Sequence, residues 1–227
     1  MADMSKSSRS GGPGAESRTS AAVDSVRPIV FVLDDDPSVR EALSSLLSSA
    51  GLRVKAFASA AEFLRAKAPD SPACLVLDLQ LPDISGLDLQ RELAEVDGPP
   101  IVFISGHGDI PTSVRAMKAG AIGFLPKPFS DLELLAAIDS AITQDRKARR
   151  KRAEGAELRK CYTRLSPRER EVLPLIVAGL TNKHTAAKLG IAEITVQVHR
   201  AQIMRKMAAP SLPDLVRMAG KLRIFSL

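Results

Sequence analysis

The sequence predicts an α/β doubly wound parallel sheet followed by a small all-α domain of four helices. Two observations favour this fold class. Short apolar runs rich in β-branched residues alternate with helical patterns over residues 27–145, whereas residues 164–227 contain helical patterns alone. Residues 27–145 carry a net charge of −7, and residues 146–227 carry +13. An acidic segment joined to a strongly basic one indicates two domains, with a polyanion as partner of the second.

The remaining composition excludes several classes of protein. Residues 1–26 contain seven serines and three glycines, which predicts a disordered tail without the apolar core of a secretory signal. No uncharged stretch approaches the roughly 18 apolar residues that span a bilayer, so we expect a cytoplasmic protein without membrane contact. The two cysteines, Cys74 and Cys161, match no zinc-binding spacing, and Cys74 is expected to be a buried thiol.

Five apolar runs are the predicted strands: residues 28–33, 53–57, 74–78, 101–105 and 123–126. Five helical stretches alternate with them: residues 37–50, 60–67, 86–95, 111–119 and 130–144. This alternation is typical of βαβ units, in which helices cover both faces of a parallel sheet. The first predicted helix begins with Pro37 directly after Asp36, a pair that predicts an N-cap aspartate.

Polar side chains stand where these strands end, namely Asp34, Asp35, Asp78, Ser105 and Lys127. Because the carboxyl ends of parallel strands meet at one edge of the sheet, these side chains are expected to converge there, where such folds bind ligands. Mg²⁺ fits the carboxylates, since it prefers oxygen ligands and retains waters and phosphate oxygens. Asp78 is the predicted nucleophile, whose carboxylate would form an aspartyl phosphate. Lys127 and Ser105 would contact the phosphoryl group.

The second domain begins at "LSPRERE", in which Ser166 and Glu169 predict a capping box. Three further short helices follow, with Gly190 in the turn between the second and third, which favours a helix-turn-helix. Residues 146–163 form a basic linker between the domains, with six basic residues among positions 146–152. A solvated extension of the preceding helix is the favoured interpretation, although Gly155 would weaken it and an auxiliary phosphate contact is the alternative.

Residues 27–145 resemble the receiver domain of two-component response regulators, a CheY-like (βα)5 fold. The resemblance rests on "VLDDD", "CLVLD", "DLQLPDISG", "IVFISGHGD" and "MKAGAIGFLPKPF", in this order. It implies that Asp78 accepts a phosphoryl group from a sensor histidine kinase. It also implies Mg²⁺ as cofactor, held by Asp35, Asp78 and the backbone carbonyl of Gln80, with Asp34 assisting through water.

The same resemblance implies a switch. Lys127 would contact the phosphoryl group, the Ser105 hydroxyl would turn toward it, and the Phe124 ring would move inward. This change would promote dimerisation and operator binding. Apart from phosphorylation and dephosphorylation of its own Asp78, no enzymatic activity is expected. His107, in "SGHGD", is interpreted as an exposed loop residue rather than a catalytic base.

Residues 164–227 resemble the LuxR-type helix-turn-helix of the FixJ/NarL group, through "LSPREREVL", "GLTNK", "AAKLGI", "TVQVHRAQIMRKM" and "LVRMA". This resemblance implies a recognition helix at about residues 193–207, with Val196 and Ile203 on its core side. The implied contacts with double-stranded DNA are Lys183, Thr195, Gln197, Val198, Arg200, Ala201, Arg205 and Lys206. The overall likeness also suggests a nodulation-type regulator.

Four positions depart from the usual pattern of this helix-turn-helix. Ala192 stands where a capping serine is common. The missing cap is expected to lower the stability of the helix by about 1 kcal/mol. Gln197 stands where lysine is common, and an amide there could pair with adenine. Thr185 stands where a buried isoleucine is usual. Pro174 falls inside a predicted helix, where a proline can lower helix stability by about 3 kcal/mol or produce a kink.

Two other interpretations are kept open. A constitutive DNA-binding regulator with a vestigial receiver is one, although the presence of Asp34, Asp35, Asp78, Ser105 and Lys127 weighs against it. A magnesium-dependent phosphatase that forms an aspartyl phosphate is the other. Such enzymes usually carry a second carboxylate two residues after the nucleophile, and that position is Gln80 here.

Overall fold

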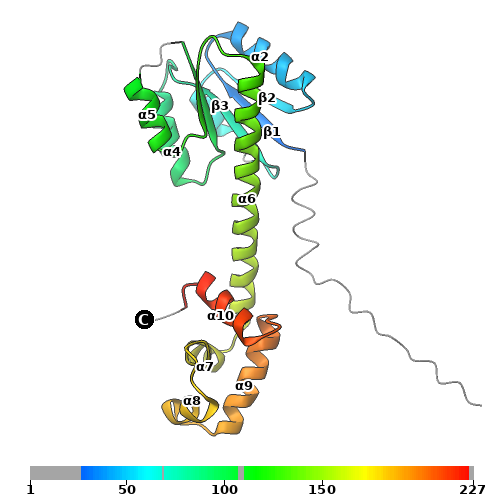
Figure 1. The fold of residues 1–227 in the computed structure, drawn as a ribbon, viewed down its shortest axis with the longest axis vertical. Coiled ribbons are helices and arrows are strands. Elements are labelled where there is room, and N and C mark those ends of the chain that lie inside the picture. Colours follow the sequence, from blue (N-terminus) through cyan, green and yellow to red (C-terminus); the bar gives the residue numbers. More distant parts are fainter. Residues whose placement is uncertain (1–26, 68, 107–109, 225–227) are drawn as a thin grey trace, which may run out of the picture. The chain divides into compact units, whose positions relative to one another are not determined.

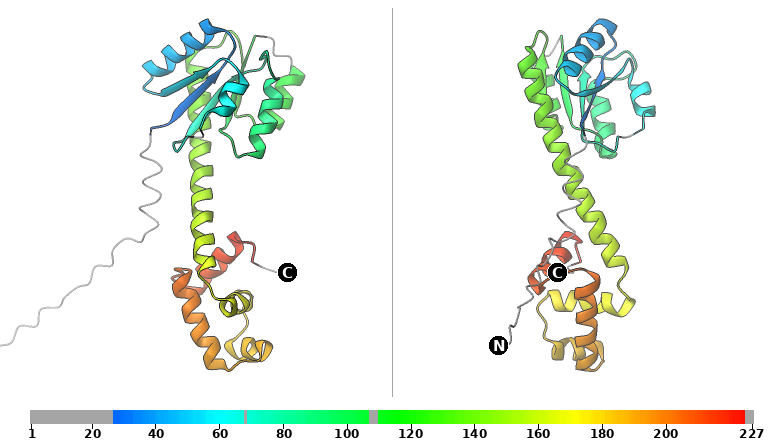
Figure 2. Two further views of the ribbon diagram at one scale, coloured as in Figure 1. Left: turned by 180° about the vertical axis from the view of Figure 1, so that it is seen from behind. Right: turned by 90° about the vertical axis from the view of Figure 1, so that its right-hand side faces the viewer.

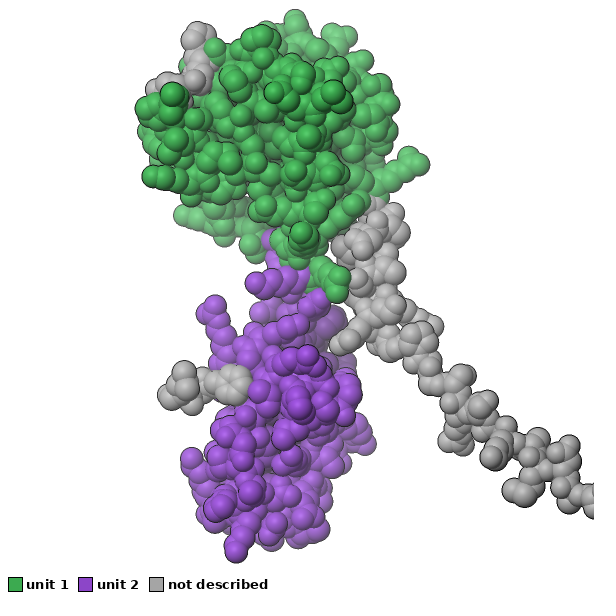
Figure 3. Space-filling view, viewed as in Figure 1, with its two compact units in different colours: residues 1–150 green, residues 151–227 purple. Residues whose placement is uncertain are grey.

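The computed structural model describes residues 27–67, 69–106 and 110–224. The predicted disordered tail, residues 1–26, lies outside these ranges. The chain forms two compact units, residues 1–150 and 151–227, which Figure 3 colours separately.

The first unit is built on a five-stranded parallel sheet in the order β2-β1-β3-β4-β5. Its strands are β1 (Ile29–Leu33), β2 (Arg53–Phe57), β3 (Ala73–Asp78), β4 (Ile101–Ser105) and β5 (Gly123–Pro126). Every residue of β1, β3 and β4 is buried, which explains why these strands are continuous apolar runs rather than alternating ones. The doubly wound sheet that the sequence predicts is therefore confirmed.

Helices cover both faces of this sheet (Figures 1 and 2). They are α2 (Pro37–Ser49), α3 (Ala60–Arg65), α4 (Gly86–Glu95), α5 (Ile110–Lys118) and α6 (Asp131–Thr163). Alternate residues of β1 point to opposite faces: Phe31 packs in the core shared with α3, α4 and α5, whereas Val32 packs in the core shared with α2 and α6. Because the faces are closed, the strand ends are the part of the sheet available to ligands.

Helix α6 runs for 33 residues and includes the basic segment 146–163. The favoured helical interpretation of that segment is thus confirmed, and Gly155 does not end the helix. Buried Asp145 fixes α6 to the sheet, because its Oδ2 accepts a hydrogen bond of 2.8 Å from the backbone N–H of Ala73. The same oxygen lies 2.6 Å from Nε of Arg149, whose Nη1 donates to the carbonyl of Pro69.

The second unit contains α7 (Pro167–Val177), α8 (Asn182–Leu189), α9 (Glu193–Lys206) and α10 (Leu212–Lys221). The predicted capping box is present: Ser166 Oγ accepts from the N–H of Glu169, and the Glu169 carboxylate accepts from the N–H of Ser166. Gly190 ends α8 in the left-handed conformation that favours glycine, with φ of 66°. Helices α8 and α9 on either side of this turn form the predicted helix-turn-helix.

Candidate functional site

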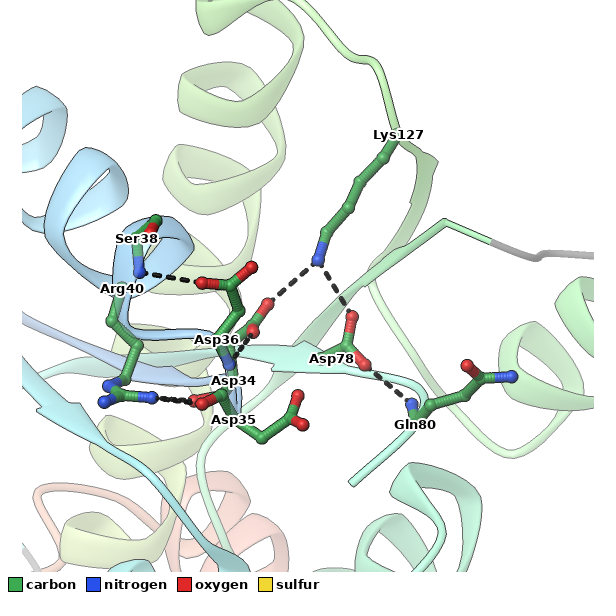
Figure 4. A network of polar contacts seen from close by, with 8 residues as sticks. All are labelled: Asp34, Asp35, Asp36, Ser38, Arg40, Asp78, Gln80 and Lys127. Carbon is green, nitrogen blue, oxygen red and sulfur yellow. Dashed lines mark hydrogen bonds and ion pairs between the residues drawn. The ribbon is translucent and has the colours of Figure 1, made fainter. Parts of the chain in front are cut away.

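The carboxyl ends of β1, β3 and β5 bring two of the predicted carboxylates and the predicted ammonium together (Figure 4). Strands β1 and β3 are paired in parallel up to Leu33 and Leu77, so Asp34 and Asp78 end side by side. Lys127 follows β5, and its Nζ lies 2.9 Å from Asp34 Oδ2 and 3.0 Å from Asp78 Oδ1. Asp34 is 1% exposed and Asp78 7%, so the single positive charge of Lys127 offsets part of the negative charge of two almost fully buried carboxylates.

Burial and pairing act in opposite directions on these charges. Burial raises the pKa of Asp78, and the hydrogen bonds from Lys127 and from the N–H of Gln80 only partly offset this rise. Burial by itself would lower the pKa of Lys127, but its hydrogen bonds to Asp34 and Asp78 outweigh that effect and raise this pKa. The lysine is therefore a firmly charged ammonium beside the two carboxylates.

The other predicted metal ligands lie close to this pair. The N–H of Gln80 donates to Asp78 Oδ2 over 2.7 Å. Asp35 is exposed, and its carboxylate projects from the end of β1 on the side of Asp78 (Figure 4). Asp36 has the capping role that the sequence predicts, since its Oδ1 accepts from the N–H of Ser38 over 2.8 Å.

The oxygen atoms at this edge of the sheet are possible ligands of Mg²⁺. Over the described ranges, no three histidine, cysteine, aspartate or glutamate side chains group closely enough to hold a metal ion. Asp34 and Asp78 nevertheless converge on one cation, the Lys127 ammonium. Mg²⁺ is commonly bound through only one or two carboxylates, with waters and phosphate oxygens completing its shell. The oxygen donors at this edge therefore fit a magnesium ion with few protein ligands.

The predicted hydroxyl and aromatic ring lie on neighbouring strands. Ser105 ends β4 and is buried, and its carbonyl accepts from the N–H of Lys127 over 2.7 Å. Phe124 is half-buried on β5, and its ring centroid lies 6.2 Å from that of Phe103. Both residues thus lie near the sheet edge that carries Lys127, whereas His107 falls outside the described residues.

Sequence reasoning does not assign Arg40 to the site, but the structure places it there. Its Nη1 donates to the backbone carbonyls of Asp34 and Asp35, each over 2.8 Å (Figure 4). Arg40 lies four residues after the N-cap Asp36, so its long side chain can reach back over the first turn of α2. That spacing is the only signal in the sequence, and it equally fits a solvated arginine.

The predicted recognition helix corresponds to α9 in the second unit. Val196 and Ile203 are fully buried, which confirms the predicted core side of the helix. On the other sides, Thr195 and Arg200 are half-buried, and Gln197, Val198, Ala201 and Arg205 are exposed. Arg200 Nη1 lies 3.4 Å from Asn182 Oδ1 at the start of α8, where Lys183 is also exposed. The helix therefore presents a mixed surface, on which two arginines lie beside exposed apolar side chains such as Val198.

Lys206 has a partner that the sequence does not reveal. Its Nζ lies 2.7 and 2.9 Å from the two carboxylate oxygens of Glu169, whose side chain is 5% exposed. Burial by itself would raise the pKa of Glu169, but the hydrogen bonds from Lys206 and Ser166 outweigh that effect and lower it. The predicted phosphate contact is thus engaged in an ion pair between α9 and α7.

Three of the positions that depart from the usual helix-turn-helix pattern can be located in this unit. Ala192 occupies the N-cap position of α9 without a side-chain cap, as predicted. Thr185 is fully buried, and within the described residues no partner accepts or donates a hydrogen bond at its Oγ1. Pro174 lies inside α7, which continues to Val177.

Comparison with known proteins agrees with both units. Residues 30–139 match the family described as response regulator receiver domain, and residues 163–219 match the family described as bacterial regulatory proteins, luxR family. The chain belongs to the two-component response regulators of the FixJ/NarL group, in which a receiver domain is combined with a LuxR-type DNA-binding domain. It is therefore a transcription regulator.

Similar proteins align over most of the chain. Nodulation protein W of Bradyrhizobium diazoefficiens is 52% identical over 88% of this chain and 88% of its own. The response regulator protein TodT of Pseudomonas putida is 48% identical over 86% of each chain. Transcriptional regulatory protein FixJ of Azorhizobium caulinodans is 47% identical over 84% of this chain and 90% of its own.

Two solved structures resemble the chain over both units. The response regulator StyR has a TM-score of 0.77 at 49% identity and covers 86% of this chain and 100% of its own. Full-length FixJ from B. japonicum has a TM-score of 0.52 at 41% identity, covering 87% and 98%. Among the described residues, no helix has the length and apolar character needed to cross a membrane.

Proposed function

We propose that this regulator is controlled by phosphorylation of Asp78, with a sensor histidine kinase as the phosphoryl donor. The observation that carries the proposal is the position of the Lys127 ammonium between Asp34 and Asp78 at the carboxyl edge of a parallel sheet. A nucleophilic carboxylate beside a fixed ammonium suits phosphoryl transfer, because catalysis of that reaction depends mainly on positioning and on neutralising charge.

Asp78 Oδ2 accepts from the backbone N–H of Gln80, whereas Oδ1 accepts from the side chain of Lys127, which can move. Oδ1 is therefore the oxygen assigned to the attack. The Asp78 Oδ1–P bond forms as the P–N bond of the kinase phosphohistidine breaks, and the imidazole leaves with the electron pair of that bond. Lys127 then pairs with a phosphoryl oxygen. Asp34, Asp35, Asp78 and the carbonyl of Gln80 would hold Mg²⁺, which neutralises phosphoryl charge when bound.

The phosphoryl group would then act on Ser105 and Phe124. The hydroxyl of Ser105 turns to donate to a phosphoryl oxygen, and the Phe124 ring moves inward behind it. This movement would reshape the face formed by α5 and α6, which promotes dimerisation. Exposed apolar side chains at the starts of these two helices support the proposal: Ile110 of α5 and Leu132 of α6 are each 80% exposed.

DNA binding is assigned to α8 and α9. Exposed Gln197, Val198 and Ala201, with Thr195 and Arg200, would face the major groove, while Lys183 and Arg205 would contact phosphates. Lys206 would reach a phosphate only by leaving Glu169. Two subunits would bind two half-sites of a nearly two-fold operator.

The cellular role follows from similarity alone. The name of nodulation protein W supports a role in the control of nodulation genes, and the domain composition supports action in the cytoplasm.

The test is the intact mass of the full-length protein after incubation with acetyl phosphate and Mg²⁺. Addition of one hydroxylamine-sensitive phosphoryl group is expected in the wild type and in Asp83→Asn, a control in the same loop. No addition is expected in Asp78→Asn. Equal labelling of all three proteins would overturn the assignment.

A further inference from the structure

One guanidinium nitrogen holds two consecutive carbonyls at the edge of the acidic site. Arg40 Nη1 carries two hydrogens, and these reach the carbonyls of Asp34 and Asp35, each over 2.8 Å. Asp34 and Asp35 follow the last residue of β1, Leu33, and precede the N-cap of α2. The arginine therefore fixes the short connection between the strand and the helix.

Further hydrogen bonds restrain the same connection. Asp34 Oδ1 accepts from the N–H of Asp36 over 2.9 Å, and the N–H of Asp34 is 3.4 Å from the carbonyl of Phe57. Unlike the carboxylate of Asp34, that of Asp35 is held by no hydrogen bond or ion pair among the described residues. Its direction is thus set by its backbone, and the Asp35 carbonyl is held by Arg40.

We propose that Arg40 is a positioning residue for the cation site, which holds the backbone of Asp34 and Asp35 so that their carboxylates face the cation. The inference rests on the proposed function, because it takes Mg²⁺ as the ion that these carboxylates bind. Hydrogen-bonding partners that orient metal ligands commonly affect metal affinity by about 10- to 100-fold when they are removed.

The charge of Arg40 would have the opposite effect. A guanidinium near a magnesium site repels the ion, so an arginine that acted only through its charge would weaken Mg²⁺ binding. Its removal would then strengthen binding. If Arg40 acts by positioning, its removal weakens binding, so the sign of the change separates the two explanations.

The experiment is an NMR titration of the full-length protein with MgCl₂ at constant ionic strength, without phosphodonor, following the amides of Asp36 and Gln80. Arg40→Met removes the hydrogen bonds but keeps an unbranched apolar side chain. We expect its Kd for Mg²⁺ to rise by about tenfold. An unchanged or lower Kd would overturn the inference.

Arg53→Met is the matched control, because it removes the same charge from an exposed position. Arg53 is the first residue of β2 and pairs with Ile29 at the start of β1, whereas the site lies beyond the other end of that strand. The Kd of this control variant is expected to equal that of the wild type. The amide spectrum outside the site shows whether Arg40→Met remains folded, and Arg40→Gln provides a second variant if it does not. Absence of Mg²⁺ binding by the wild type would instead contradict the proposed function.

Discussion

The ammonium of Lys206 at the end of α9 lies 2.7 and 2.9 Å from the two carboxylate oxygens of Glu169 in the first turn of α7. Glu169 also closes the capping box by accepting from the N–H of Ser166 over 2.7 Å. One buried carboxylate therefore connects the start of the domain to the end of its recognition helix.

This pair predicts a dependence of stability on pH. Since folding lowers the pKa of Glu169 from its ordinary value of 4.5, its contribution is present above pH 4.5 and is lost as the pH falls through the folded value. Glu169→Gln should lower the free energy of unfolding by about 2 kcal/mol at neutral pH and remove part of the acid dependence. The single tyrosine, Tyr162, packs on the core of this unit, so its fluorescence reports the unfolding. An unchanged acid dependence would contradict the ion pair.

Thr185 offers a stabilising substitution. Its buried hydroxyl lacks a partner among the described residues, so Thr185→Val should raise the free energy of unfolding by about 1 kcal/mol. Thr185→Ser keeps the hydroxyl but loses a methyl group, and is expected to be less stable than the wild type. Urea denaturation followed by Tyr162 fluorescence measures both changes, and a destabilised valine variant would show that the hydroxyl is satisfied.

Lys127 occupies the position between the carboxylates that the metal is proposed to bind. Lys127→Met removes a repelling charge, so Mg²⁺ should bind about tenfold more tightly, although phosphorylation by acetyl phosphate should be strongly slowed. Calorimetric titration measures the affinity, with Lys118→Met, an exposed lysine of the same unit, as control. Weaker binding of Mg²⁺ by Lys127→Met than by the control would argue against a shared cation position.

Two lysines of the second unit should differ in DNA binding. Lys183 is exposed, so Lys183→Ala should weaken binding to all sequences and reduce the slope of log K against log salt by about 1. Lys206 is held by Glu169, so Lys206→Ala should chiefly lower stability and change that slope less. Anisotropy titrations at several salt concentrations measure the slopes. Equal reductions would show that Lys206 leaves Glu169 to contact phosphate.

Much of the fold could be predicted because it depends on local patterns. The apolar runs of β1, β3 and β4 are nearly the strands themselves, and the Ser166 capping box marks the start of α7. The convergence of Asp34, Asp78 and Lys127 followed from one topological rule, since parallel strands end at the same edge.

The contacts that sequence reasoning missed depend on packing between distant residues. Nothing near Lys206 indicates Glu169, which lies 37 positions earlier. Nothing near Asp145 indicates its contact with Ala73, which fixes α6 to the sheet and spans 72 positions. Arg40 is local in sequence, but its contacts are with backbone carbonyls, whose directions appear only in the folded chain.

Control of DNA binding by phosphorylation of Asp78 can be measured directly. The most direct measurement is selection from a mixed DNA pool by the wild type and by Asp78→Asn, with Mg²⁺, with and without acetyl phosphate, alongside molar mass in solution. We predict that the donor produces dimers and tighter, selective binding in the wild type only. Equal binding by both proteins, with or without the donor, would contradict control through Asp78.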